Sequence, residues 1–182
     1  VGDKAAVVSV IEPVVSRVAA LYQHGKIGVI ATKGTIKSDV YAKRLKELNQ
    51  SLQVVSLATP LLAPMIEEGF FNNKISRTVI NSYLERPKLK KIDALILACT
   101  HYPLIRPEIE EYYKQKVKII DSAEIVAESV FNQLAEKGLL NTAKTAKSKF
   151  YVSDYTESFA SSTKIFYKNK IQLELYPLWE NE

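Results

Sequence analysis

The sequence alternates between β-branched apolar runs and amphipathic stretches along most of its 182 residues, and this alternation constrains the fold most. The strongest run, Ile92 to Leu97, is almost continuously apolar, which is typical of a central strand covered on both faces of a parallel sheet. Further strands are predicted over residues 7–11, 27–30, 52–57, 117–120, 149–152 and 171–176. We therefore predict an α/β fold with parallel sheets covered by helices.

Capping residues and prolines place the helices between these strands. Ser38 is predicted to cap a helix that ends at Leu48, after a loop over residues 32–35 that contains Gly34. The other helices are expected over residues 13–22, 60–69, 75–84, 103–113, 123–137 and 157–167. The last but one ends before Gly138, a residue type that is common just after a helix.

Composition narrows the classes of protein that remain. Apolar residues make up 47% of the chain and charged residues 25%, the balance of a soluble globular protein. A single cysteine excludes an internal disulfide and, with two histidines, is a poor set of zinc ligands, so we expect no metal site and a cytoplasmic location. No apolar stretch has membrane-spanning length. The lysines behind the net charge of +5 are scattered, which argues against nucleic-acid binding as the main function.

The segment Ala98 to Leu104 follows the strongest apolar run, where a parallel strand is expected to lead into a helix. Residues at the carboxyl end of such a strand face the crevice above the sheet, where α/β proteins bind ligands. The segment holds Cys99, whose thiol can serve as a base near neutral pH, and His101, which lies close enough in sequence to tune it.

Four segments resemble segments of the glutamate racemases and follow one another in the same order along the chain. They are residues 10–13, 27–36, 62–69 and 95–104. The resemblance implies cofactor-independent interconversion of L- and D-glutamate, which supplies D-glutamate for bacterial peptidoglycan. It also implies two similar α/β lobes that face each other, with one cysteine from each lobe on opposite sides of the substrate. No lysine stands out as a Schiff base, in agreement with a reaction that needs no pyridoxal phosphate. Glutamate is the expected partner, no membrane is expected, and a homodimer is compatible with the resemblance.

The resemblance also assigns roles to single residues. It makes Cys99 the second-lobe acid and base, with an acidity that we expect the helix start and the His101 imidazole to raise. It implies that Glu67 supports proton transfer or holds the substrate ammonium group. It also implies that the hydroxyl groups of Thr32, Thr35 and Thr100 hold the substrate carboxylate or amino group.

By the same likeness, residues 21–121 are predicted to form the second lobe, and residues 1–20 and 122–182 the remainder of the first lobe. The first-lobe cysteine and an Asp-Ser-Gly motif of the family have no match here and would lie before Val1. Racemisation removes a proton from one face of Cα and returns one to the other, so a rigid site needs acid/base groups on both faces. We therefore expect that this chain alone does not racemise an amino acid.

Other interpretations of these residues stay open. A lone cysteine is commonly a small buried apolar residue, and threonines often cap helices or turns. A second interpretation is that the chain belongs to a related enzyme that acts on aspartate or a hydantoin. A third interpretation is a non-catalytic α/β fragment that binds a partner through its basic surface.

Overall fold

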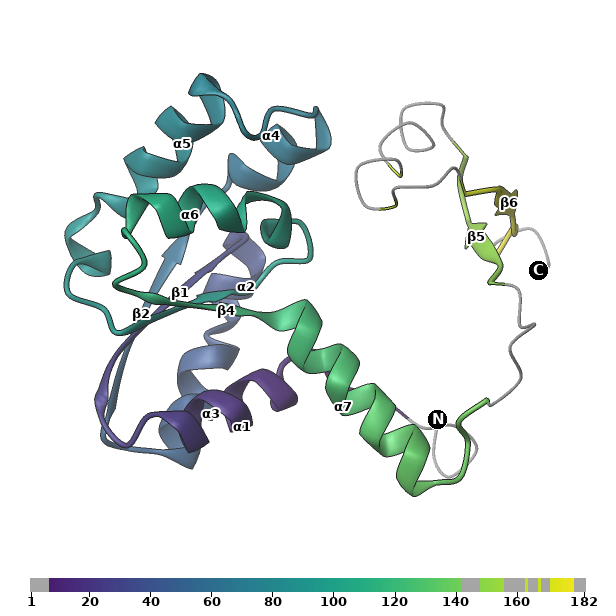
Figure 1. The fold of residues 1–182 in the computed structure, drawn as a ribbon, viewed down its shortest axis with the longest axis horizontal. Helices are drawn as coiled ribbons and strands as arrows, with labels where there is room; N and C mark the ends of the chain where they lie inside the picture. Colours follow the sequence, from purple (N-terminus) through teal and green to yellow (C-terminus); the bar gives the residue numbers. More distant parts are fainter. Residues whose placement is uncertain (1–6, 142–147, 156–162, 164–166, 168–170, 179–182) are drawn as a thin grey trace.

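The computed structural model describes residues 7–141, 148–155, 163, 167 and 171–178 (Figure 1). The strands are β1 (Gly25–Ala31), β2 (Leu52–Ala58), β3 (Ala94–Leu97), β4 (Lys118–Asp121), β5 (Phe150–Val152) and β6 (Leu173–Leu175). The helices are α1 (Glu12–Leu21), α2 (Lys33–Ser38), α3 (Val40–Leu48), α4 (Leu62–Glu67), α5 (Lys74–Leu84), α6 (Arg106–Tyr112) and α7 (Ser122–Glu136), with 3-10 turns η2 (Pro87–Leu89) and η3 (Tyr102–Ile105).

Four parallel strands form the main sheet in the order β2-β1-β3-β4. The predicted α/β fold is confirmed, and β3 lies between two neighbours as its continuous apolar run predicted. The register pairs Ala31 with Ala58, Ile30 with Leu97 and Leu97 with Asp121. The carboxyl ends of all four strands therefore meet at one edge of the sheet.

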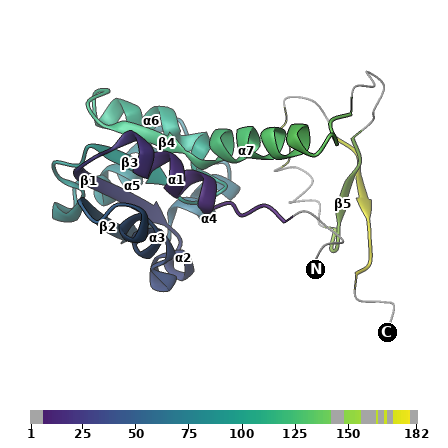
Figure 2. The same ribbon diagram turned by 90° about the horizontal axis from the view of Figure 1, so that it is seen from below.

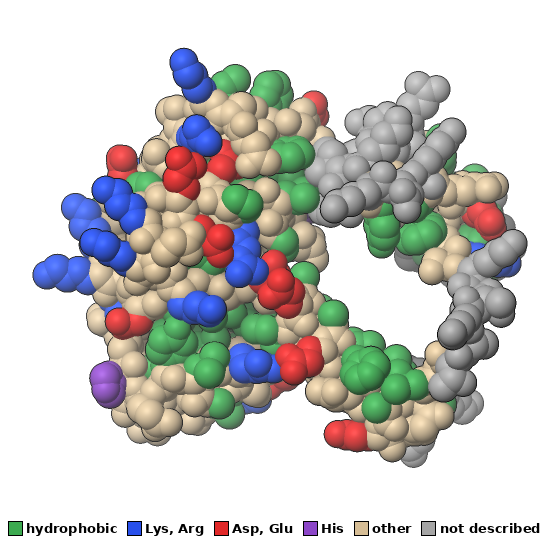
Figure 3. All heavy atoms as spheres, viewed as in Figure 1, with side chains coloured by type: hydrophobic (Ala, Val, Ile, Leu, Met, Phe, Trp, Pro, Cys, Tyr) green, Lys and Arg blue, Asp and Glu red, His purple; other side chains and the backbone are tan. Residues whose placement is uncertain are grey.

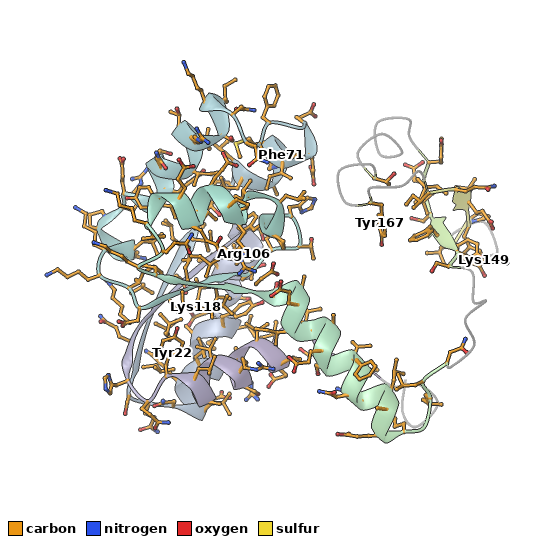
Figure 4. All side chains as sticks on the ribbon, in the orientation of Figure 1. Tyr22, Phe71, Arg106, Lys118, Lys149 and Tyr167 are labelled. Atoms are coloured by element: carbon orange, nitrogen blue, oxygen red, sulfur yellow. The ribbon has the colours of Figure 1, made fainter. Side chains whose placement is uncertain are left out.

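Helices cover both faces of this sheet (Figure 2). Because successive side chains of a strand point to opposite faces, Leu95 and Leu97 belong to one core cluster and Ala94 and Ile96 to the other. The first cluster also contains residues of α4, α5 and α6, and the second contains residues of α1 and α3. Figure 4 shows this division through Phe71 and Tyr22, which pack against the first and the second cluster, respectively, on opposite sides of the sheet.

The strand predicted over residues 7–11 is wrong. These residues form no strand, and α1 begins directly after them. Val7 and Val10 have exposed fractions of 74% and 60%, so β-branched side chains alone did not produce a strand here. A strand needs a neighbour for its backbone groups, and no described strand pairs with this segment.

The segment after β1 also differs from the prediction. Residues 32–35 are not a loop, because α2 begins at Lys33 with Thr32 as its N-cap. Ser38 ends α2 instead of capping the next helix, and its hydroxyl donates to the carbonyl oxygen of Thr35 over 2.8 Å. Asp39, with a φ of 55°, makes the sharp left-handed bend between α2 and α3. The early start of α2 brings two threonine hydroxyls close to the edge of the sheet.

The core of the main sheet extends upstream of residue 21. Val14, Val15 and Val18 of α1 are fully buried in the same cluster as Ile27 of β1. This packing ties α1 to the body that was predicted to begin at residue 21. The assignment of residues 1–20 and 122–182 to a first lobe stays a prediction.

Helix α7 extends from the end of β4 toward the small parallel pair formed by β5 and β6 (Figure 2). It has no buried residue, and Figure 3 shows hydrophobic side chains on its surface. Phe131 of this helix has an exposed fraction of 58%. Gly138 follows the helix with a φ of +65°, as predicted for its end.

Within the described ranges, no helix is both long and apolar enough to cross a membrane. The helix predicted over residues 157–167 lies almost entirely outside the described residues.

The buried face of β3 makes a direct test of the fold. Ile96 is fully buried, so we expect Ile96→Ala to lower the free energy of unfolding by about 2–5 kcal/mol through lost packing and a residual cavity. The matched control is Ile75→Ala on α5, where an exposed fraction of 57% predicts a change of at most about 0.5 kcal/mol. Urea unfolding followed by circular dichroism measures both, and equal effects would contradict the placement of β3.

Candidate functional site

The candidate site lies at the edge where the four strands end. Cys99 comes two residues after β3, and His101 is the residue before the 3-10 turn η3. Thr32 directly follows β1 and caps α2, and Glu67 is the last residue of α4. Residues from three separate parts of the chain thus reach one region because their strands are parallel and in register.

Cys99, His101 and Glu67 form a continuous chain of polar contacts. The Sγ atom of Cys99 lies 3.7 Å from Nδ1 of His101, and Nε2 of the same ring lies 2.9 Å from Oε1 of Glu67. The histidine is partly buried, with 25% of its side chain exposed, whereas 54% of the Glu67 side chain is exposed. The structure therefore brings together the three residues that the resemblance proposed as catalytic.

This geometry defines what each atom can do. When Nε2 carries a proton and donates a hydrogen bond to Glu67, Nδ1 of a neutral His101 can accept a hydrogen bond from the Cys99 thiol. Transfer of the thiol proton to Nδ1 gives a thiolate beside an imidazolium, and the carboxylate of Glu67 stabilises that imidazolium. The Thr100 hydroxyl lies 3.5 Å from the same Nδ1, so it also contacts the ring nitrogen that faces the sulfur.

The expected rise in the acidity of Cys99 is wrong for this structure. Burial raises the pKa of the thiol, because an apolar surrounding disfavours the thiolate. Hydrogen bonds from the backbone N–H groups of His101 and Tyr102 lower the pKa, and the negative charge of Glu67 raises it. The backbone N–H groups of the turn do lower the pKa of Cys99, as predicted, but burial raises it by more.

A cavity of about 380 Å³ opens beside Cys99. Its walls come from the segment before α1, from α3, from the residues that follow β3 and from α7, and they are mostly apolar. The residues are Val10, Tyr41, Ala98, Cys99, Thr100, Ser122, Ala123, Val126 and Ala127. Among the described residues, no group of three or more His, Cys, Asp or Glu side chains could hold a metal ion.

The sequence analysis missed two cavity residues that carry hydroxyl groups, Tyr41 and Ser122. Ser122 directly follows β4, so the rule that drew attention to Cys99 at the end of β3 would also have found it. Tyr41 lies on α3 with an exposed fraction of 5%, and burial and a charge at Cys99 both raise the pKa of its hydroxyl. No motif marks Tyr41, and only the packing of α3 places it beside the thiol.

The two threonines near the start of α2 interact with each other. Their Oγ1 atoms lie 3.1 Å apart, and Oγ1 of Thr32 accepts a hydrogen bond from the backbone N–H of Thr35 over 3.5 Å. Both residues are partly buried, whereas Thr100 is exposed. The structure thus shows a capping role for Thr32, and substrate binding by Thr32, Thr35 and Thr100 stays a prediction.

Comparison with known families and curated proteins gives a consistent result. Residues 4–130 match the family model described as Asp/Glu/Hydantoin racemase. The chain is 40% identical over 154 residues to a glutamate racemase of Geobacter metallireducens, covering 84% of this chain and 57% of that protein. It is 39% identical over 170 residues to a glutamate racemase of Streptococcus pneumoniae serotype 19F, and this match covers 92% of this chain and 64% of that protein. The chain therefore spans less than two thirds of the length of these curated relatives.

Solved structures show the same similarity in three dimensions. A glutamate racemase from Francisella tularensis, determined in complex with D-glutamate, superimposes with a TM-score of 0.86 at 37% identity, over 96% of this chain and 65% of that one. The RacE1 glutamate racemase isoform from Bacillus anthracis superimposes with a TM-score of 0.85 at 32% identity. This superposition covers 97% of this chain and 66% of that one.

The raised pKa of Cys99 predicts a slow reaction with alkylating reagents at neutral pH. Only the thiolate reacts, so the rate of alkylation by iodoacetamide should reach half its maximum at a higher pH in the folded chain than in the chain unfolded in guanidinium. Cys99 is the only cysteine, so mass spectrometry of intact protein reports on this thiol alone. A midpoint below that of the unfolded chain would contradict the effect of burial.

Proposed function

Because the chain belongs to the Asp/Glu/Hydantoin racemase family, we propose that it forms part of a cofactor-independent racemase that interconverts L- and D-glutamate. The observation that carries this proposal is the contact chain from Cys99 through His101 to Glu67 at the edge of the sheet. Glutamate is favoured as substrate because the relatives named glutamate racemase share 38% to 41% identity with the chain in several organisms. The aspartate racemase from Picrophilus torridus shares 21% and supports the fold alone.

In this proposal Cys99 moves the proton at one face of the substrate Cα. The thiolate removes the Cα proton in one direction of the reaction, and the thiol returns a proton in the other. His101 receives the thiol proton when the thiolate forms, and Glu67 holds the imidazole in the orientation that this transfer requires. The hydroxyl groups of Thr32, Thr35 and Thr100 are proposed to hold the substrate carboxylate or amino group.

The opposite face of Cα needs a second acid/base group. Since Cys99 is the only cysteine among the 182 residues, a second cysteine would have to come from outside them. The curated relatives are longer than this chain, and we propose that the corresponding part of a whole protein supplies the opposite face. We further propose, from the family resemblance, that the D-glutamate serves peptidoglycan synthesis in the cytoplasm.

Hydrogen exchange at Cα tests the reaction. We would join the portion of the Geobacter metallireducens relative that precedes its matched segment to the amino terminus of this chain. This chimera would be incubated with glutamate in heavy water. We expect deuterium at Cα and interconversion of the enantiomers, detected by NMR and chiral chromatography, and no racemisation by the 182 residues alone. Cys99→Ser should lower racemisation by about a hundredfold or more, because an alcohol is a far weaker acid than a thiol.

Three outcomes would contradict this proposal. A folded chimera without exchange or racemisation would refute the reaction. Equal rates with and without Cys99→Ser would remove the thiol from the mechanism. Turnover of aspartate or a hydantoin in place of glutamate would refute the substrate.

Two adjacent glutamates allow a matched test of the Glu67–His101 contact. Glu67→Gln keeps the size of the side chain but removes the charge that orients and stabilises the imidazolium, so kcat in the active chimera should fall about tenfold. Glu68→Gln is the control, because Glu68 is the neighbouring and likewise exposed carboxylate, whereas the ion pair with His101 is made by Glu67. Equal effects of the two changes on kcat would show that the contact is not used.

A further inference from the structure

A buried pair of hydroxyl groups lies beneath the candidate site. Thr59 and Tyr102 have exposed fractions of 1% and 0%, and Oγ1 of Thr59 lies 2.7 Å from the Tyr102 hydroxyl oxygen. The threonine hydroxyl can donate to the carbonyl oxygen of Ala31 over 3.3 Å, and either hydroxyl can be the donor in the shorter contact. The tyrosine hydroxyl can donate to the Thr59 carbonyl oxygen over 3.3 Å. Both hydroxyl groups are thus satisfied by each other and by the backbone.

This pair connects the ends of three strands. Thr59 directly follows β2, and its backbone N–H donates to the carbonyl oxygen of Ala31, the last residue of β1, over 2.9 Å. Tyr102 lies in the turn after β3, and its own N–H donates to the Cys99 carbonyl oxygen over 3.2 Å. This buried side-chain contact therefore joins the turn that carries Cys99 and His101 to the ends of β1 and β2.

The position of this turn sets the hydrogen bonds that the Cys99 sulfur receives. The backbone N–H groups of His101 and Tyr102 both stabilise the thiolate and lower the pKa of Cys99. Nδ1 of the His101 imidazole lies 3.7 Å from the sulfur. Glu67 also acts on the thiol, and a charge on the thiol acts on the hydroxyl groups of Tyr41 and Tyr102. Hydrogen bonds depend steeply on distance and angle, so a small displacement of the turn weakens these contacts before it disturbs the sheet.

We propose that Thr59 is a positioning residue for Cys99, which it serves by holding the Tyr102 hydroxyl and thereby fixing the Cys99–Tyr102 turn against the end of β1. The Thr59 hydroxyl bonds to the Tyr102 hydroxyl and to the Ala31 carbonyl oxygen, so Thr59 acts on the thiol through Tyr102. The role deepens the proposed racemase function and rests on it, but the arrangement is tested without any substrate. A failure here would leave the reaction itself untouched.

Thr59→Val removes the hydroxyl and keeps the shape of the side chain. We expect the midpoint pH of Cys99 alkylation by iodoacetamide to rise by about 0.5 to 1, which slows the reaction at pH 7 about threefold to tenfold. Tyr102→Phe should give a similar shift, and the double variant should shift no further than either single variant, because both remove the same contact. Thr59→Ser restores the hydroxyl and should return the midpoint close to that of the unchanged chain.

The control separates positioning from general stability. Thr78→Val removes an exposed threonine hydroxyl on α5 that bonds to the Lys74 carbonyl oxygen, far along the chain from the thiol, and should leave the midpoint unchanged. Circular dichroism and thermal melting show whether each variant is folded. A lower melting temperature for Thr59→Val with an unchanged midpoint would overturn the proposal, since that result describes a purely structural role. If Thr59→Val does not fold, an unchanged midpoint in folded Tyr102→Phe overturns it equally.

Discussion

The parallel register of four strands is the constraint on which the rest of the structure depends. Because β2, β1, β3 and β4 run in the same direction, the segments that follow them meet at one edge although they are far apart in the sequence. Thr32, Thr59 and Cys99 each come within two residues of the end of a different strand. The two apolar clusters on the faces of the sheet fix the strands, and the edge is left for polar side chains.

Much of this arrangement could be predicted from the sequence because it follows from local patterns. The apolar run from Ile92 to Leu97 indicated an interior strand, and β3 occupies that position. Cys99 and His101 are two residues apart just after this strand, so their proximity needed no knowledge of the rest of the fold. The contact with Glu67 is different, because only the family resemblance suggested it and only the packing of α4 beside η3 produces it.

The errors have a common cause, which is that tertiary surroundings decided between local alternatives. Residues 7–11 carry β-branched side chains, yet they form no strand because no described strand pairs with them. Thr32 and Ser38 are both good capping residues, and the path of the chain out of β1 selected Thr32. The pKa of Cys99 was expected to fall because of the turn, whereas the burial of the thiol raises it.

The raised pKa of Cys99 is compatible with the proposed chemistry. The Cα proton of an amino acid is very weakly acidic, and a thiolate with a higher pKa is a stronger base, although less of it is present at neutral pH. Burial strengthens the base by raising the pKa of the thiol, and the backbone N–H groups of His101 and Tyr102 oppose that rise. The balance depends on how closely the turn approaches the sulfur. A buried contact between Thr59 and Tyr102, well below the cavity surface, is therefore a suitable place to set it.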